Sequence, residues 1–365
     1  MKLAILGSRG IPARYGGFET FAEQIASRLA AAGVNVTVFC PSDARRPDST
    51  YQGVTLRYIR QTPLGPFAEL AWDLRCLWAA RTGFDIVYML GVGAGPAMWI
   101  PRVFGSTVWV NSDGLEWKRS KWGRAQRQYL RFAESSSVLF ASRIIADANA
   151  IADYLKERYP RKRTISMIAY GAELRNEPHI AAKTEVRGLK SKNYYLVVCR
   201  LEPENHVQEM IEGFLRSKSE LPLIVVGNIL QLNSYVRQLL TYRSDRVQFL
   251  GAIFDQEELG TLRRNAKAYL HGHSVGGTNP SLLEAMACAN LVIAHDNPFN
   301  REVLSNSGLF FSGSQDIAKL VDAIESDQLD VDSMCHQALS IARERYSWEK
   351  IAQEYLELLR QEASR

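Results

Sequence analysis

The sequence predicts an α/β protein made of two doubly wound units in series, each a mostly parallel sheet with helices on both faces. Short apolar segments alternate with longer segments of helical periodicity from the first residue onward, which is typical of such sheets. The length of 365 residues also exceeds that of one ordinary domain. The alternation fails once, over residues 171–193, where the charge rises. We therefore expect a first domain over 1–170, a linker over 171–193, a second domain over 194–345, and a C-terminal helix within 346–365 that packs back on the first domain.

The individual elements follow from the hydrophobic pattern. The first strand is expected over residues 3–6 and the next helix over 18–32, because Phe21, Ile25 and Leu29 recur at four-residue spacing. Further strands of the first domain are expected at 34–39, 55–59, 86–89, 107–111 and 143–146. For the second domain we expect strands at 195–199, 223–226, 246–249, 268–271 and 291–294, and helices at 207–217, 256–265 and 280–288. The last helix is expected over 348–361. Sheets of this kind bind ligands at the carboxyl ends of their strands, and two such edges can face one another across a cleft.

Composition and charge narrow the class of protein. Hydrophobic residues make up 46% and charged residues 23%, which is globular composition, and the net charge of +5 gives no reason to expect a nucleic-acid partner. The basic excess is uneven, with six cations, two acids and three aromatic residues between 112 and 131: Lys118, Arg119, Lys121, Arg124, Arg127, Arg131, Asp113, Glu116, Trp117, Trp122 and Tyr129. Such a cluster is either a solvated surface or a site for a phosphate-bearing or membrane-surface partner.

Cysteine spacing and hydropathy indicate the compartment. The five cysteines are scattered without a CxxC pair, which favours buried thiols in a reducing compartment over disulfides or zinc. The apolar start of the chain is too short for a signal peptide, and no stretch approaches 18 uncharged apolar residues. We expect a cytoplasmic protein. The Trp-rich segment 66–81 fits an ordinary core helix better than a helix on a membrane surface, and both readings stay open.

The first glycine-rich turn, Gly7 to Glu19, joins the first strand to the first helix. Its glycines, at 7, 10, 16 and 17, do not form GxGxxG, and the ending of a P-loop is missing, so a dinucleotide site is disfavoured. Gly16 and Gly17 just before a helix would let an anionic ligand approach backbone N–H groups. A turn needed only for chain reversal is the alternative.

The segment His271 to Ala287 is the most informative in the chain. A strand ends at His271, a glycine-rich loop follows, and a helix is expected with Asn279 as its N-cap and Pro280 at its first position. Free N–H groups at that end form an anion site. Glu284 lies one turn into a helix that is otherwise nearly all apolar, and a carboxylate there is costly to bury without hydrogen-bond partners.

A third group of polar residues, Asn111 to Arg119, follows an apolar strand. Asp113 and Glu116 lie three residues apart in a loop at a strand's carboxyl end, which suits a polar reaction centre. A turn or N-cap role for Asp113 is an equal competitor.

Two further patterns give weaker support for a metal or ligand site. Asp330 and Asp332 have the spacing of a metal-binding DxD but precede the last helices, so we expect a turn and cap and no metal. His271 and His273 are expected on opposite sides of an extended chain, which leaves His273 as the ligand candidate.

On these segments the whole chain resembles retaining glycosyltransferases of family four, which have the GT-B fold of two Rossmann-like domains. In that family a glutamate, seven residues and a second glutamate precede an Ala-Met-Ala run; Glu284 matches the second glutamate, and the first falls on Gly276. Arg200 matches the family's diphosphate-binding arginine, while the lysine five residues later is Asn205 here, with His206 beside it. Four segments further resemble a bacterial subgroup of rhamnosyltransferases for surface polysaccharide: 10–20, 113–119, 200–206 and 273–280.

The resemblance implies retaining transfer of a sugar from a nucleotide-sugar donor to a hydroxyl, without a cofactor or metal. It implies dTDP-L-rhamnose as the leading donor, before UDP- and GDP-sugars, and a lipid-linked glycan at the inner membrane face as acceptor, with peripheral membrane contact. Asp113, Arg200 and Glu284 are then the catalytic candidates. The donor-binding candidates are Gly16, Gly17, Arg200, Asn205, His206, His273, Gly276, Gly277, Thr278, Asn279 and Glu284. The acceptor-binding candidates are Arg14, Tyr15, Asp113 and Glu116.

Two other functions stay open at this point. The same fold hosts nucleotide-sugar epimerases, which need no glycan acceptor. A catalytically degenerate binding subunit is the alternative that Gly276 and Asn205 suggest, since the family has charged residues at both positions.

Overall fold

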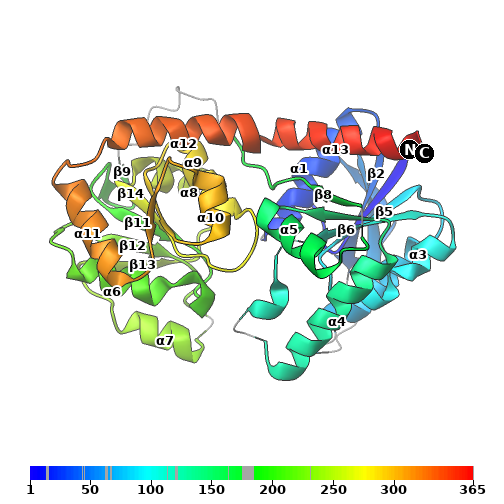
Figure 1. Ribbon diagram of the computed structural model, residues 1–365, viewed down its shortest axis with the longest axis horizontal. Helices are drawn as coiled ribbons and strands as arrows, with labels where there is room; N and C mark the ends of the chain where they lie inside the picture. The colour runs from blue at the N-terminus through cyan, green and yellow to red at the C-terminus, as the bar shows by residue number, and fades with distance from the viewer. Residues whose placement is uncertain are drawn as a thin grey trace. The chain divides into compact units, whose positions relative to one another are not determined.

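The structure is a computed structural model that describes residues 1–13, 16–42, 44, 46–61, 65, 68–112, 114–119, 122–162, 164–174, 185–230 and 232–364. It divides into two compact units, Met1–Tyr170 with Trp348–Arg365, and Gly171–Ser347. Each unit is built around a sheet of mostly parallel strands with helices packed on it, so the predicted α/β class is confirmed (Figure 1).

Among the described residues, the sheet of the first unit has eight strands in the order β3-β4-β2-β1-β5-β6-β7-β8. They are β1 (Lys2–Leu6), β2 (Asn35–Ser42), β3 (Ser49–Tyr51), β4 (Val54–Arg60), β5 (Ile86–Leu90), β6 (Thr107–Ser112), β7 (Arg143–Ala146) and β8 (Ile165–Met167). All neighbours pair in parallel except β3, an antiparallel edge strand that the hydrophobic pattern did not predict. The central strands β1 and β5 are almost fully buried, as expected for strands covered on both faces.

The helical elements of the first unit include the C-terminal helix. They are α1 (Gly17–Ala31), α2 (Ala68–Ala79), η2 (Gly95–Ala97), α3 (Trp99–Val103), η3 (Glu116–Lys118), α4 (Arg124–Phe140), α5 (Asn149–Arg158) and α13 (Trp348–Ala363). As predicted, α1 buries Phe21, Ile25 and Leu29. The helix α13 packs on the same core, where the hydroxyls of Tyr355 and Tyr88 lie 2.8 Å apart.

The segment expected as either a core helix or a membrane-surface helix has a buried and an exposed side over its described residues, and its contact with a membrane stays a prediction. On α2, Trp72, Cys76 and Leu77 are buried, while Leu74 and Trp78 on the opposite side are exposed. Within the described ranges, no helix has the length and hydropathy needed to cross a membrane.

The second unit has a smaller sheet, all parallel, with six strands among the described residues in the order β13-β12-β11-β14-β15-β16. These are β11 (Tyr195–Val198), β12 (Leu223–Val226), β13 (Val247–Gly251), β14 (Ala268–His271), β15 (Val292–His295) and β16 (Leu309–Phe311). Its helical elements are η4 (Pro203–Asn205), α6 (Val207–Arg216), α7 (Ser234–Leu240), α8 (Gln256–Asn265), α9 (Pro280–Ala287), α10 (Pro298–Leu304), α11 (Ser314–Glu325) and α12 (Val331–Tyr346). Within the expected linker, β9 (Glu185–Val186) and β10 (Leu189–Lys190) form a hairpin, and residues 175–184 lie outside the described part.

The order of strands decides where a ligand can approach the second sheet. From β11 the chain proceeds outward through β12 to β13, and from β14 it proceeds in the other direction through β15 to β16. The loops after β11 and β14 therefore diverge, and the carboxyl ends of these two strands form the crevice in which open α/β sheets bind ligands. The segments singled out in the sequence, 200–206 and 271–279, are those two loops.

We expect the buried ion pair between β7 and α13 to be required for the stability of the first unit. Arg143 and Glu362 are both nearly buried and their charged atoms lie 2.5 Å apart, so Arg143→Ala removes one partner of a buried ion pair. The expected loss of unfolding free energy is about 3–5 kcal/mol. All seven tryptophans belong to the first unit, so tryptophan fluorescence during urea unfolding reports on it directly.

The matched control is Arg28→Ala, which breaks the ion pair of α1 with Glu349 of the same C-terminal helix at 2.8 Å. Because Glu349 is largely exposed, the expected loss is about 0–1 kcal/mol. Equal losses of unfolding free energy in the two variants would contradict the argument that burial makes the Arg143 pair the more important one.

Candidate functional site

The loops after β11 and β14 are joined by hydrogen bonds and by close backbone packing. The backbone N–H and the hydroxyl of Ser274 both donate to the carbonyl oxygen of Glu204, at 3.1 and 2.9 Å. A Cβ atom on Gly272 would lie 2.0 Å from the carbonyl oxygen of Asn205, so only glycine permits this approach. On α9, the Ser281 hydroxyl donates to the carbonyl of Val198 at the end of β11, at 2.9 Å. The two predicted segments therefore lie together at one edge of the sheet.

Arg200 is an accessible cation of the loop after β11. Its side chain is 46% exposed, and its ion pair with Glu202 is long, at 3.8 Å. Asn205, in contrast, is buried and donates its amide to the carbonyl oxygen of Arg200 at 2.7 Å. The side chain of Asn205 thus holds the turn that presents Arg200, which is a positioning role and not the ligand contact expected from the sequence.

The start of α9 has the predicted cap. The side chain of Asn279 accepts a hydrogen bond from the N–H of Ser281 at 3.0 Å, and Pro280 is the first helical residue. Gly277 and Thr278 are buried, and Gly276 has φ +133° with no atom within 4 Å of an added Cβ. Backbone conformation and not lack of space therefore requires glycine at 276, where a glutamate would be strained.

Glu284 has a partner within the chain that the sequence did not identify. Its carboxylate lies 2.5 Å from a guanidinium nitrogen of Arg263, which comes from α8 and is almost completely buried. The carboxylate therefore has a partner, as its burial requires, and contact with a donor stays a prediction. Since the Glu284 side chain is still 34% exposed, it neutralises the buried arginine on one side and is open to a ligand on the other.

The histidines of this edge form two stacked pairs. The rings of His271 and His273 lie 4.5 Å apart at 17°, and those of His206 and His295 lie 4.3 Å apart at 24°. The prediction that His271 and His273 point to opposite sides is wrong, because side chains two residues apart in an extended chain share one side. The ring nitrogen Nδ1 of His206 lies 2.5 Å from a carboxylate oxygen of Glu209.

Burial, followed by the charge of His273 and then of His295, lowers the pKa of His271 well below its ordinary value. Burial, followed by the charge of His206, also lowers the pKa of His295. Both rings are therefore neutral near pH 7, so they add no permanent positive charge to that of Arg200.

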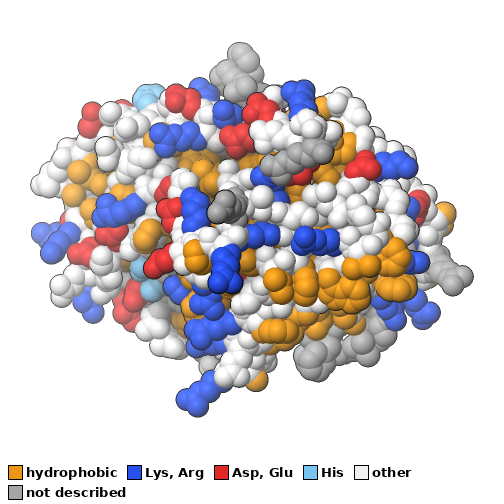
Figure 2. All heavy atoms as spheres, turned by 45° about the vertical axis from the view of Figure 1, so that its right-hand side comes forward, with side chains coloured by type: hydrophobic (Ala, Val, Ile, Leu, Met, Phe, Trp, Pro, Cys, Tyr) orange, Lys and Arg blue, Asp and Glu red, His pale blue; other side chains and the backbone are white. Residues whose placement is uncertain are grey.

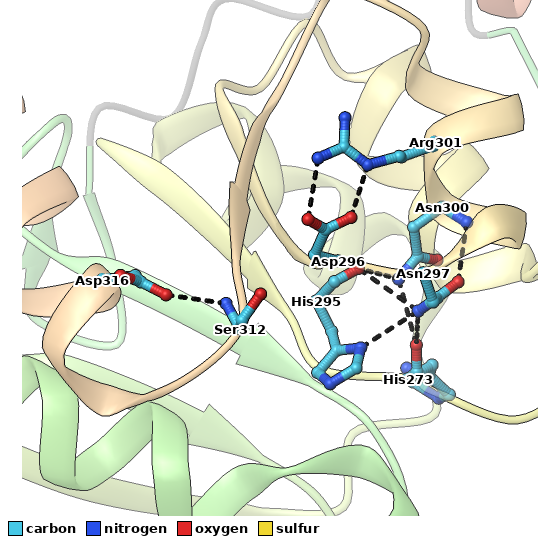
Figure 3. Close-up of polar contacts among 8 residues, drawn as sticks. All are labelled: His273, His295, Asp296, Asn297, Asn300, Arg301, Ser312 and Asp316. Carbon is cyan, nitrogen blue, oxygen red and sulfur yellow. Dashed lines mark hydrogen bonds and ion pairs between the residues drawn. The ribbon is translucent and has the colours of Figure 1, made fainter.

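The loop after β15 belongs to the same edge, and the sequence reasoning missed it (Figure 3). The side-chain amides of Asn297 and Asn300 both donate to the carbonyl oxygen of His273, at 3.0 Å each. Asn300 also donates to the carbonyl of His295 at 2.9 Å. The sequence did contain a sign of this loop, because the polar residues directly follow an apolar strand. They match no known motif, however.

In the first unit, the glycine-rich turn carries its own carboxylates. Glu19 accepts a hydrogen bond from the N–H of Arg9 at 2.7 Å, and Glu23 accepts one from the N–H of Ala13 at 2.6 Å. A Cβ on Gly16 would lie 2.0 Å from a carboxylate oxygen of Glu19. A negative side chain thus lies beside Gly16 and Gly17, where an anionic ligand was expected.

The acceptor candidates are only partly described. Arg14, Tyr15 and Asp113 lie outside the described residues. Glu116 pairs with Arg119 at 2.6 Å and accepts a hydrogen bond from the Trp122 indole at 3.0 Å.

Two further observations bear on metals. The expected cap is confirmed at Asp330, whose side chain accepts a hydrogen bond from the N–H of Ser333 at 3.1 Å at the start of α12. A search of the described part of the chain finds no group of three or more His, Cys, Asp or Glu side chains placed to hold a metal ion.

Comparison with known families divides the chain in the same way as its fold. Residues 181–345 match the family described as glycosyl transferases group 1, and residues 1–173 match one described as a domain of unknown function, DUF1972. An uncharacterized glycosyltransferase of Methanocaldococcus jannaschii is 24% identical over 226 residues, which are 59% of this chain and 57% of that protein. The chain thus matches less than two thirds of that relative's length.

Solved structures establish the fold. Sucrose-phosphate synthase of Thermosynechococcus elongatus is similar with a TM-score of 0.85 at 20% identity, covering 99% of this chain and 98% of that one. HepE of Anabaena, solved in complex with UDP-glucose, has a TM-score of 0.78 at 18% identity and covers 99% of each chain. The two doubly wound units are therefore those of the GT-B fold, as expected.

We expect His271 to make stability depend on pH. Because the folded chain keeps His271 neutral while the unfolded chain protonates it below about pH 6.5, stability falls as the pH drops below that value. In His271→Asn this contribution is absent, so the difference in melting temperature between pH 7.5 and pH 5.5 becomes smaller. The exposed His336→Asn on α12 serves as the control. An unchanged pH dependence in His271→Asn would show that His271 is not held neutral.

Proposed function

We propose that this chain, whose residues 181–345 match the glycosyl transferases group 1 family, transfers a sugar from a nucleotide-sugar donor to a hydroxyl group. The observation that carries the proposal is the meeting of the loops after β11 and β14 at the point where the strand order reverses. There an exposed arginine, a helix N-terminus and a half-exposed carboxylate lie on adjoining segments: Arg200, the start of α9 at Pro280, and Glu284.

Each of these groups suits one part of a sugar nucleotide. The leaving group of the transfer is a diphosphate, whose developing negative charge needs preorganised positive charge. Arg200 supplies a permanent one, and the N-terminus of α9 adds the partial positive charge of its helix dipole. The exposed side of Glu284 accepts hydrogen bonds from ribose hydroxyls. Because these protein groups supply the positive charge, we propose a reaction without a metal or cofactor.

The donor and acceptor are proposed from the resemblance of four segments to rhamnosyltransferases of surface polysaccharide: 10–20, 113–119, 200–206 and 273–280. On that basis the donor is dTDP-L-rhamnose, transfer is retaining, and the acceptor is a lipid-linked glycan. The HepE structure in complex with UDP-glucose supports a nucleotide sugar as the class of donor, and makes UDP-sugars the first alternative. With such an acceptor, the protein acts at a membrane surface as a peripheral protein.

We expect nucleotide sugars to stabilise the chain against heat, with dTDP-L-rhamnose the strongest in a panel with UDP- and GDP-sugars. A ligand present at 100 times its Kd adds about 2.7 kcal/mol, which corresponds to a shift of several degrees. In Arg200→Met we expect this shift to be lost together with turnover. Arg216→Met, an exposed arginine at the far end of α6, is the control and keeps both.

Two outcomes of the same panel would contradict the proposal. No stabilisation by any nucleotide sugar rules out the donor site. Stabilisation and interconversion of the sugar, without transfer to any acceptor, identifies an epimerase instead.

We expect Glu284 to have two separable functions. Glu284→Ala leaves the buried Arg263 without a counter-charge, at an expected cost of about 3–5 kcal/mol. Removing both charges in Glu284→Gln with Arg263→Met restores most of the stability, but not the stabilisation by the donor. If the double variant recovered donor binding as well, Glu284 would be purely structural.

A further inference from the structure

The described helices of the first unit expose an apolar surface that the proposed donor site does not use. Its residues are 45% to 69% exposed and come from α2, from α3 with the residue after it, and from α4: Trp78, Trp99, Val103, Phe104, Phe132 and Leu139. We name these six residues the α2–α4 patch. In the space-filling view, hydrophobic side chains gather in one broad area of this unit, with Lys and Arg side chains at its borders (Figure 2).

Side-chain contacts join the three helices into one surface. The Arg81 guanidinium lies 4.4 Å from the centre of the Trp78 ring and 5.9 Å from that of Phe104, which connects the ends of α2 and α3. Arg102 of α3 donates to the carbonyl of Phe140 at 3.1 Å, beside Leu139. Phe132 and Leu139 are seven residues apart, two turns of α4, and so share one face of it.

The exposed charges of α3 and α4 have one sign. The helices α3 and α4 carry the exposed side chains of Arg102, Arg124, Arg127 and Arg131. The acidic residue of these two described helices, Glu134, is buried and accepts hydrogen bonds from Tyr154, Tyr159 and Trp117. The exposed positive charge of α3 and α4 is therefore not balanced by exposed acidic side chains on these two helices.

We propose that the α2–α4 patch binds the surface of a membrane that contains anionic lipids. Tryptophan, phenylalanine and leucine beside arginine suit the boundary between headgroups and acyl chains, where the rings bury and the guanidinium groups meet phosphate. The proposal extends the proposed function, because a lipid-linked acceptor lies at such a surface.

Charge favours a membrane over a second copy of the chain. In a two-fold dimer through this face, the same patch would meet itself, and the arginines of one copy would face those of the other. Anionic headgroups complement these arginines instead, with a gain of about fivefold in binding for each basic residue near the surface.

The test is sedimentation of the full chain with vesicles of phosphatidylcholine, with and without phosphatidylglycerol. We expect binding that requires the anionic lipid. Phe132→Ser with Leu139→Ser, and separately Arg124→Glu with Arg127→Glu, are each expected to weaken it at least about 10-fold. The controls are Leu230→Ser and Arg237→Glu, exposed positions of the second unit that should keep full binding.

Three results would overturn the proposal. These are no binding to anionic vesicles, equal binding by patch variants and controls, and a dimer that the apolar double variant dissociates without any vesicle binding. A urea unfolding curve like that of the unaltered chain, followed by tryptophan fluorescence, shows that a variant is folded. The patch variants should keep the rise in melting temperature that nucleotide sugars cause. If nucleotide sugars cause no such rise in the unaltered chain, the proposed function is contradicted, whereas the proposal of membrane binding is not.

Discussion

The close approach of two loops in the second unit determines what this edge of the sheet can bind. A parallel sheet has a crevice where its strand order reverses. The two loops that diverge there can form a binding site only if they are held at the sides of this crevice. Here the backbone of Gly272 lies against the carbonyl of Asn205, and the backbone N–H of Ser274 donates to the carbonyl of Glu204. Because backbone atoms make these contacts, the arrangement depends little on side-chain rotamers, and it presents Arg200 and the start of α9 at one edge.

The polar groups around this crevice serve the fold as well as a ligand. Arg263 is buried and needs the charge of Glu284, while Asn297 and Asn300 hold the backbone of His273. His271 and His295 are neutral near pH 7 because burial lowers the pKa of each ring. In a site built in this way the exposed Arg200 is surrounded by groups whose positions are fixed before a ligand arrives. Such preorganisation is what stabilisation of a leaving group requires.

The helices and strands could be predicted from the sequence, but the contacts between particular side chains could not. Strands such as Ile86–Leu90 and helices such as Gln256–Asn265 follow from periodicity, and the cap at Asn279 follows from local chemistry, so each was predicted correctly. The pairing of Glu284 with Arg263 joins residues 21 positions apart on two helices, and no local pattern encodes it. The stacking of His271 on His273 was predictable, but the two-residue period of an extended chain was applied wrongly. The acceptor candidates Arg14, Tyr15 and Asp113 remain predictions.

Hydrogen–deuterium exchange of the full chain, with and without a nucleotide sugar, tests the central claim most directly. If one sugar nucleotide binds where the two loops meet, amides within 199–206 and 271–284 become protected together, while those of β12 and β13 on the far side of the sheet change little. Protection in only one of the two loops, or protection confined to other parts of the second unit, would contradict a single site formed by both.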